Sequence, residues 1–74
     1  MSRLPVLRPQ TVIRALQRGG FQTARIRGSH YHLVDPRTGR RVTVPHHNRD
    51  LSRSLLNSIL NQAGMSADEF LGLL

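Results

Sequence analysis

The spacing of the hydrophobic residues predicts a helix near the start of the chain. Val12, Ile13 and Leu16 recur at the three- and four-residue intervals that place side chains on one face of a helix. Pro9 suits the first helical position, because an N–H group is not needed there. The pair Gly19-Gly20 ends the segment, since glycine readily adopts the left-handed conformation found at helix ends. We therefore expect a helix over residues 9–18.

The next part of the chain changes to the alternating pattern that is typical of strands. Val42 and Val44 alternate with polar neighbours, as on a strand with one buried face. Two turns separate three such segments, with glycine supplying a positive φ and Pro36 fixing φ in the second turn. Pro45 is expected to end the third segment. The predicted strands are residues 21–27, 30–35 and 40–44, joined by turns at 28–29 and 35–39.

A second apolar stripe returns to helical spacing and predicts a helix over about residues 52–63, with Gly64 as its stop. Ser66 and Glu69 then have the three-residue spacing of a capping box, which predicts a short final helix over residues 67–73. The stripe of the longer helix consists of Leu55, Leu56, Ile59, Leu60 and Ala63.

The order of these elements predicts one α+β domain over residues 1–74: a helix, three antiparallel strands, a helix and a short helix. Both main helices are expected on one face of the sheet, which leaves the other face open. Side chains alternate along a strand, so burial of Leu33 would place His30 and His32 together on the open face. Val34 shares that face, which is an unusual place for an apolar residue.

The charge of the chain favours an anionic partner. The 74 residues carry a net charge of +7, and all 11 basic residues are arginine. This balance is typical of proteins that bind nucleic acid or an acidic protein, and guanidinium groups bind phosphate bidentately. The absence of cysteine excludes disulfides and thiolate metal sites. No apolar run could span a membrane and no apolar signal region opens the chain, so we expect a cytoplasmic protein.

The segment from Gly28 to His32 is the strongest candidate for chemistry. The Gly28-Ser29 turn leads directly into His30, which places that histidine at the rim of the sheet. An imidazole with a pKa of about 6.5 can give and take protons near neutral pH. The pattern indicates acid–base chemistry on a nucleic-acid backbone. Arginines on both sides could attract a polyanion: Arg25, Arg27, Arg37, Arg40 and Arg41.

Taken together, these segments resemble the HicA toxins of bacterial toxin–antitoxin pairs. The resemblance covers nearly the whole chain in the expected order, and the Val-Thr-Val-Pro strand makes it far more specific than Gly-Ser-His alone. The matching segments are Val12–Leu16, Gly20-Phe21, Arg25, Gly28–His30, Asp35–Gly39, Arg41–Pro45 and Leu56–Phe70.

The resemblance implies a fold like that of the double-stranded RNA-binding domain and an endonuclease that cleaves mRNA, an mRNA interferase. It also implies that His30 is the essential residue and that a co-expressed antitoxin, HicB, covers it. Two features depart from the family pattern. Tyr31 separates His30 from His32, where many relatives have adjacent histidines, and Arg8 stands where a capping Ser or Thr is common. Neither departure removes the proposed catalytic residue.

We therefore predict that His30 is the general acid or base while the 2′-hydroxyl of RNA attacks the phosphate. No cofactor is expected. His32 should lie on the same face, about 6–7 Å away, but no motif assigns it a second proton transfer. The pair His46-His47 is expected in a solvated loop or an antitoxin contact. The predicted RNA contacts are Arg25, Arg27, Gly28, Ser29, His32 and Arg41.

Three alternatives stay open from the residues alone. A noncatalytic RNA-binding module of the same fold would account for the charge without needing His30. An interaction domain recognised only by an acidic protein would account for it too. Finally, His30 and His32 could bind one zinc ion, although no carboxylate stands at a recognisable ligand spacing.

Overall fold

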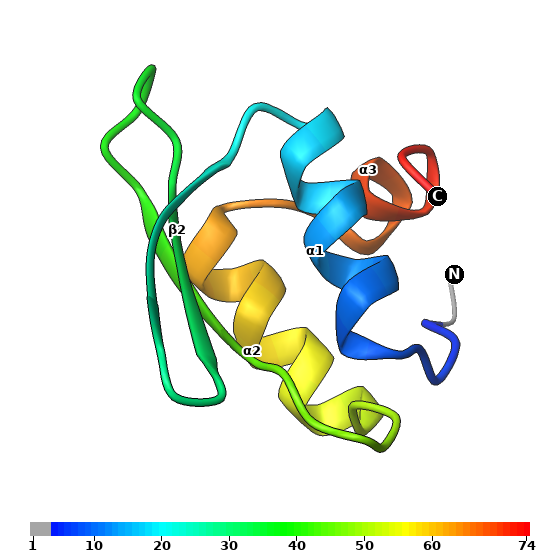
Figure 1. Ribbon diagram of the computed structural model, residues 1–74. Helices are drawn as coiled ribbons and strands as arrows, with labels where there is room; N and C mark the ends of the chain where they lie inside the picture. The colour runs from blue at the N-terminus through cyan, green and yellow to red at the C-terminus, as the bar shows by residue number, and fades with distance from the viewer. Residues whose placement is uncertain (1–3) are drawn as a thin grey trace.

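The computed structural model describes residues 4–74 and shows two layers, with the helices packed against one face of an antiparallel sheet (Figure 1). The shortest of its principal extents, 33 × 30 × 17 Å, matches one sheet covered by one layer of helices. No helix within residues 4–74 is long and apolar enough to cross a membrane. This arrangement confirms the predicted α+β fold. The elements are α1 (Pro9–Arg18), β1 (Gln22–Arg27), β2 (His30–Val34), β3 (Arg41–Pro45), α2 (Arg53–Ala63) and α3 (Ala67–Leu71).

The three strands pair in chain order, β1-β2-β3, and both pairs are antiparallel. A two-residue turn joins β1 to β2. Gly28 adopts a φ of 55° there, while no residue other than glycine has a positive φ within the part of the chain described. Glycine at the first turn position gives a hairpin turn that matches the twist of the flanking strands. The turn therefore makes His30 the first residue of β2.

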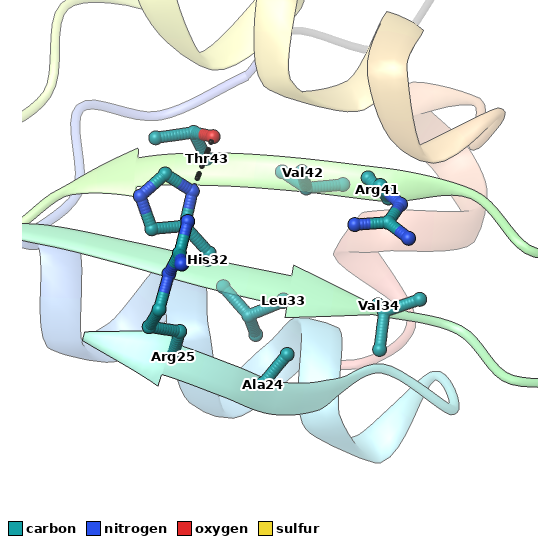
Figure 2. A pocket seen from close by; sticks show the side chains of 8 residues that line it. All are labelled: Ala24, Arg25, His32, Leu33, Val34, Arg41, Val42 and Thr43. Carbon is teal, nitrogen blue, oxygen red and sulfur yellow. Dashed lines mark hydrogen bonds between the residues drawn. The ribbon is translucent and has the colours of Figure 1, made fainter. Parts of the chain in front are cut away.

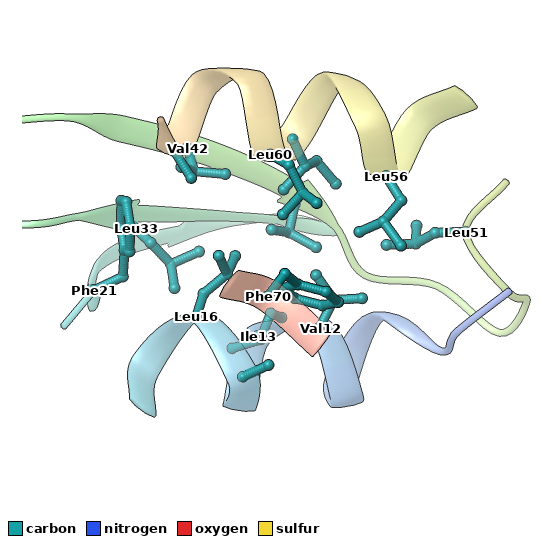
Figure 3. Close-up of a cluster of buried hydrophobic side chains, with 14 of the residues drawn as sticks. Val12, Ile13, Leu16, Phe21, Leu33, Val42, Leu51, Leu56, Leu60 and Phe70 are labelled. Carbon is teal, nitrogen blue, oxygen red and sulfur yellow. The ribbon is translucent and has the colours of Figure 1, made fainter. Parts of the chain in front are cut away.

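The core lies between the sheet and the helices (Figure 3). Leu33, Val42 and Val44 project from the sheet into this core, and Phe70 of α3 is completely buried in it. The apolar stripe predicted for α2 is correct at Leu56, Ile59, Leu60 and Ala63. It is wrong at Leu55, which is 36% exposed.

α1 has the predicted boundaries, and the other strands and helices differ from their predicted ranges by one or two residues. β3 continues through Pro45 instead of ending before it. The His46 N–H donates to the Ser29 carbonyl at 2.6 Å, so by the alternation of the ladder the nitrogen of Pro45 faces away from β2. No ladder bond is lost, which is why proline is tolerated there.

The observed helix caps agree with the caps expected from the sequence more closely than the ends of the strands do. Ser52 caps α2, accepting a bond from the Leu55 N–H at 3.1 Å, so the helix itself begins at Arg53. The capping box of α3 is present, with Ser66 and Glu69 each accepting a bond from the other's main chain. α3 ends at Leu71, two residues earlier than predicted, and the Leu73 N–H donates only three residues back, to Phe70.

An ion pair within the turn between β2 and β3 positions Arg37, which links the turn to the end of α1 by a hydrogen bond. Asp35 is buried, and its carboxylate accepts bonds from the main chain and the guanidinium of Arg37 at 2.9–3.2 Å. The same guanidinium donates to the Gly19 carbonyl at the end of α1, at 2.9 Å. Arg37 therefore holds the fold together at the end of the sheet opposite the Gly28-Ser29 turn. Arg37, one of the arginines expected to attract a polyanion towards His30, is thus already bound to Asp35 and Gly19.

Acid should weaken this ion pair. Hydrogen bonds from Arg37 lower the pKa of Asp35, so the carboxylate contributes stability above its unfolded pKa of about 3.9. That contribution is lost as the pH falls from about 4 through the folded pKa. We expect the melting temperature of the wild type to fall over this range, and to fall less steeply for Asp35→Asn.

Circular dichroism melts at a series of pH values test this prediction. Some slope will remain in the variant, because hydrogen bonds with Ser66 also lower the pKa of Glu69. Asp50→Asn, at an exposed loop position, is the matched control. Identical slopes for Asp35→Asn and the wild type would contradict the assignment.

Candidate active site

His30 is exposed at the end of the sheet where the Gly28-Ser29 turn enters β2. Its neighbours across the sheet are Arg27 on β1 and Pro45 on β3. Among residues 4–74 its side chain has no hydrogen-bond partner. Both ring nitrogens are therefore free to meet a ligand.

The pleat of β2 places His30 and His32 on the same face. Leu33 between His32 and Val34 is buried on the helix side, as predicted, so the even-numbered residues project from the open face. His32 lies two residues from His30, about 6.7 Å along the strand. Val34 is half-buried on this open face. The presence of this apolar residue therefore does not change which face of β2 packs against the helices.

Unlike His30, His32 has a partner within the sheet. Its Nδ1 lies 3.2 Å from Oγ1 of Thr43, the residue paired with it on β3 (Figure 2). Arg25 is its neighbour on the other side, on β1. This contact fixes the ring and leaves Nε2 without a protein partner among the described residues. His32 is therefore placed to bind a ligand.

Two groups of arginines differ in their contacts. Arg18 and Arg53 donate to main-chain carbonyls of Leu73 and Leu4, and so tie the ends of the chain to the helices. The arginines of the open face are exposed and make no side-chain hydrogen bond within residues 4–74. They are the predicted contacts Arg25, Arg27 and Arg41.

The structure brings most, but not all, of the predicted RNA contacts to one place. Arg27, Gly28 and Ser29 surround His30 at one end of the sheet. Arg41 pairs with Val34 at the opposite end of β2, about 13 Å along the strands from His30. A ligand that touches both Arg41 and His30 must therefore extend across the open face.

His46 is a residue whose placement the sequence analysis missed. Its ring stacks on Tyr31, with centroids 4.9 Å apart and planes inclined by 22°. Its Nε2 lies 3.1 Å from Oε1 of Gln10 on α1, and its main chain bonds Ser29. His46 therefore braces the turn that carries His30. The alternation of β3 offered the signal, because His46 continues the inward-facing series of Val42 and Val44; His47 is exposed.

The potential metal ligands do not gather at this site. In the described part of the chain, no group of three or more His, Cys, Asp or Glu residues could hold a metal ion. His30 and His32 are thus a pair without a third protein ligand among residues 4–74. The arrangement is better suited to proton transfer and anion binding than to a closed metal site.

A comparison with protein families identifies the chain. The family model described as the HicA toxin of bacterial toxin–antitoxin systems matches residues 9–65. The chain belongs to the HicA toxin family. The matched span contains α1, the whole sheet and α2, and therefore every residue of the open face. No curated protein sequence matches the chain.

Membership of the HicA family confirms the resemblance inferred from the sequence. It makes the protein a component of a toxin–antitoxin system. The match ends at Met65, yet Phe70 beyond it is a fully buried part of the core. The folded HicA domain of this chain thus extends past the family match into α3.

Proposed function

We propose that this HicA-family protein is an endoribonuclease that cleaves single-stranded RNA, with His30 as its general acid or base. The observation that carries the proposal is the placement of His30. It is exposed on the open sheet face, and its side chain has no hydrogen-bond partner within residues 4–74. Arg27 lies directly across from it on β1, and Arg25 is the next arginine along that strand. Such a site offers proton transfer beside cationic groups that bind phosphate.

The chemistry needs few protein groups because RNA carries its own nucleophile. The 2′-hydroxyl loses its proton and its oxygen attacks the neighbouring phosphorus, while the bond to the 5′-oxygen breaks and that oxygen takes up a proton. His30 performs one of these two transfers. Arg27, directly across from it on β1, is placed to stabilise the charge that builds up on the phosphate oxygens. The products are a 2′,3′-cyclic phosphate and a free 5′-hydroxyl.

The other predicted contacts bind the substrate. Arg25 lies beside His32 on the open face and holds a phosphate further along the strand. Gly28 has open space beside its Cα: apart from Gly28 and its two neighbours in the chain, no atom of residues 4–74 lies within 4 Å of the position a Cβ would take. The backbone of an RNA strand can therefore approach the Gly28-Ser29 turn closely.

The same surface is the expected binding site of the antitoxin. The family belongs to toxin–antitoxin pairs, and the basic open face would have to be covered to silence the site. We infer that the partner is a HicB-like protein with an acidic surface laid over the sheet. Co-expression with the product of the neighbouring gene, followed by co-purification, tests this partner. Separation of the two at high salt would agree with a charged interface.

The proposed activity makes a direct prediction about substrates. The wild-type protein should cut single-stranded RNA and leave DNA of the same sequence intact, because DNA lacks the 2′-hydroxyl. Cleavage should persist in EDTA, because no metal-activated water is required as nucleophile. Gel electrophoresis of end-labelled oligonucleotides measures both. Binding of RNA without cleavage would identify a noncatalytic module, and loss of cleavage in EDTA would revive the zinc alternative.

A further inference from the structure

A hollow of about 390 Å³ lies on the open face, lined on β2 by His32, Leu33 and Val34 and not by His30. Figure 2 shows the side chains around it, with His32 at one end and Arg41 at the other. The hollow takes residues from all three strands, so the sheet itself forms its floor. Its polar walls come from Arg25 on β1, His32 on β2, and Arg41 and Thr43 on β3. The remaining lining residues are Ala24, Leu33, Val34 and Val42.

The imidazole in this hollow is held by a chain of contacts that begins in the helical layer. Oε1 of Gln62, on α2, accepts a hydrogen bond from the Thr43 N–H at 3.3 Å. The hydroxyl of Thr43 in turn contacts Nδ1 of His32 at 3.2 Å. α2 thus fixes the outer edge of β3, and Thr43 fixes the ring. The Nε2 atom is left without a partner among residues 4–74, and when the Thr43 hydroxyl donates to Nδ1, Nε2 carries the ring proton and can donate it to an anion.

The charge of the hollow is not balanced within the protein. Arg25 and Arg41 stand on the strands either side of His32, and neither side chain has a hydrogen-bond partner within residues 4–74. Asp35 is the one acidic residue in an ion pair in the described structure, and its partner is Arg37. Two guanidinium groups and an imidazole line one hollow, and such groups suit the oxygens of a phosphate.

We propose that this hollow binds the phosphodiester group next to the one that is cleaved at His30. The inference rests on the proposed ribonuclease function and assigns the phosphate held by Arg25 to a defined subsite, shared with His32 and Arg41. His30 and His32 project from the same face about 6.7 Å apart, which is comparable with the span of one nucleotide in an extended strand. The RNA then runs along β2, from the Gly28-Ser29 turn towards Arg41.

Thr43 is the positioning residue of this subsite, because it acts through His32 rather than touching the phosphate itself. Thr43→Val keeps the branched side chain that suits a strand and removes only the hydroxyl. We expect it to raise KM for a short RNA several-fold, by more than it lowers kcat, with little change in melting temperature. Thr43→Ser restores a hydroxyl and should recover most of the loss.

Arg41→Gln tests the same hollow through a side chain that touches the phosphate directly. In a His30→Ala background, which keeps the probe intact, it should weaken binding of a five-nucleotide RNA about tenfold, as expected for one charge-assisted hydrogen bond. The slope of log affinity against log salt should fall by about 0.7. Arg14→Gln is the matched control, because Arg14 is exposed on α1, in the layer away from the open face.

The outcomes separate this proposal from the proposed function. If the wild type does not cleave RNA, the ribonuclease assignment fails, whereas NMR shifts of His32 and Thr43 on addition of the five-nucleotide RNA would still support the hollow. If the wild type cleaves RNA but Arg41→Gln and Arg14→Gln weaken binding equally, the charge acts diffusely and the subsite is overturned. Shifts at His32 and Thr43 caused by a polyglutamate peptide and not by RNA would assign the hollow to an acidic protein and overturn it too.

Discussion

His30→Ala should slow RNA cleavage by a factor of about 10² to 10⁴, the usual contribution of one general acid or base. The residue is exposed and touches no part of the core, so the melting temperature should stay within a few degrees of the wild type. RNA affinity should also persist, because the arginines of the open face remain. Cleavage rates, melts and binding isotherms, measured on the same preparations, separate these three quantities.

His47→Ala is the matched control for this variant. His47 is exposed in the loop after β3 and makes no side-chain hydrogen bond within residues 4–74, so its loss should leave cleavage unchanged. Full activity of His30→Ala would overturn the mechanism. A loss of activity accompanied by an equally large fall in melting temperature would mean that His30 is a structural residue instead.

The second large effect concerns stability. Phe70→Ala should lower the free energy of unfolding by about 3 to 5 kcal/mol, because truncating a fully buried phenylalanine removes its burial and leaves a cavity. A domain of this size has a total stability of about 4 to 11 kcal/mol. The melting temperature should therefore fall by at least about 12 °C. Leu55→Ala, at a 36% exposed position on α2, should cost far less.

Urea unfolding followed by circular dichroism measures both variants. Equal losses of free energy for Phe70→Ala and Leu55→Ala would show that α3 is not part of the cooperative core. A large loss for Phe70→Ala alone would establish that the five-residue α3 is essential, although it lies beyond the span matched by the family.

Most of the fold could be predicted because local signals and tertiary packing agree. The helix over residues 9–18 was predicted with its observed boundaries, since Pro9 and the Gly19-Gly20 pair mark its ends. Leu55 was misassigned because helical spacing shows which side chains share a face, but not how far along the helix the sheet reaches. The predicted end of the third strand before Pro45 is wrong, because Pro45 occupies a position where no N–H is needed. That position depends on the register of β2 and β3, which the sequence does not show.

The candidate site was predictable only in part. The Gly28-Ser29 turn and strand alternation placed His30 and His32 on the open face, and the structure agrees. The partners of the charged groups were not visible, because hydrogen bonds such as the one from Arg37 to Gly19 join residues far apart in the chain. The same holds for the contact of Thr43 with His32, which depends on how β2 and β3 are aligned. The catalytic and RNA-binding roles themselves stay predictions.

The alternation of side chains along the sheet also has an evolutionary consequence. On β2 and β3, the open-face positions lie outside the core, so substitutions there typically change stability by less than about 0.5 kcal/mol. The intervening positions Leu33, Val42 and Val44 are fully buried, and truncating them costs several times as much. Selection for packing therefore acts on every second residue. Packing places little constraint on the residues between them, so under the proposed function the ligand-binding surface can change while the domain still folds.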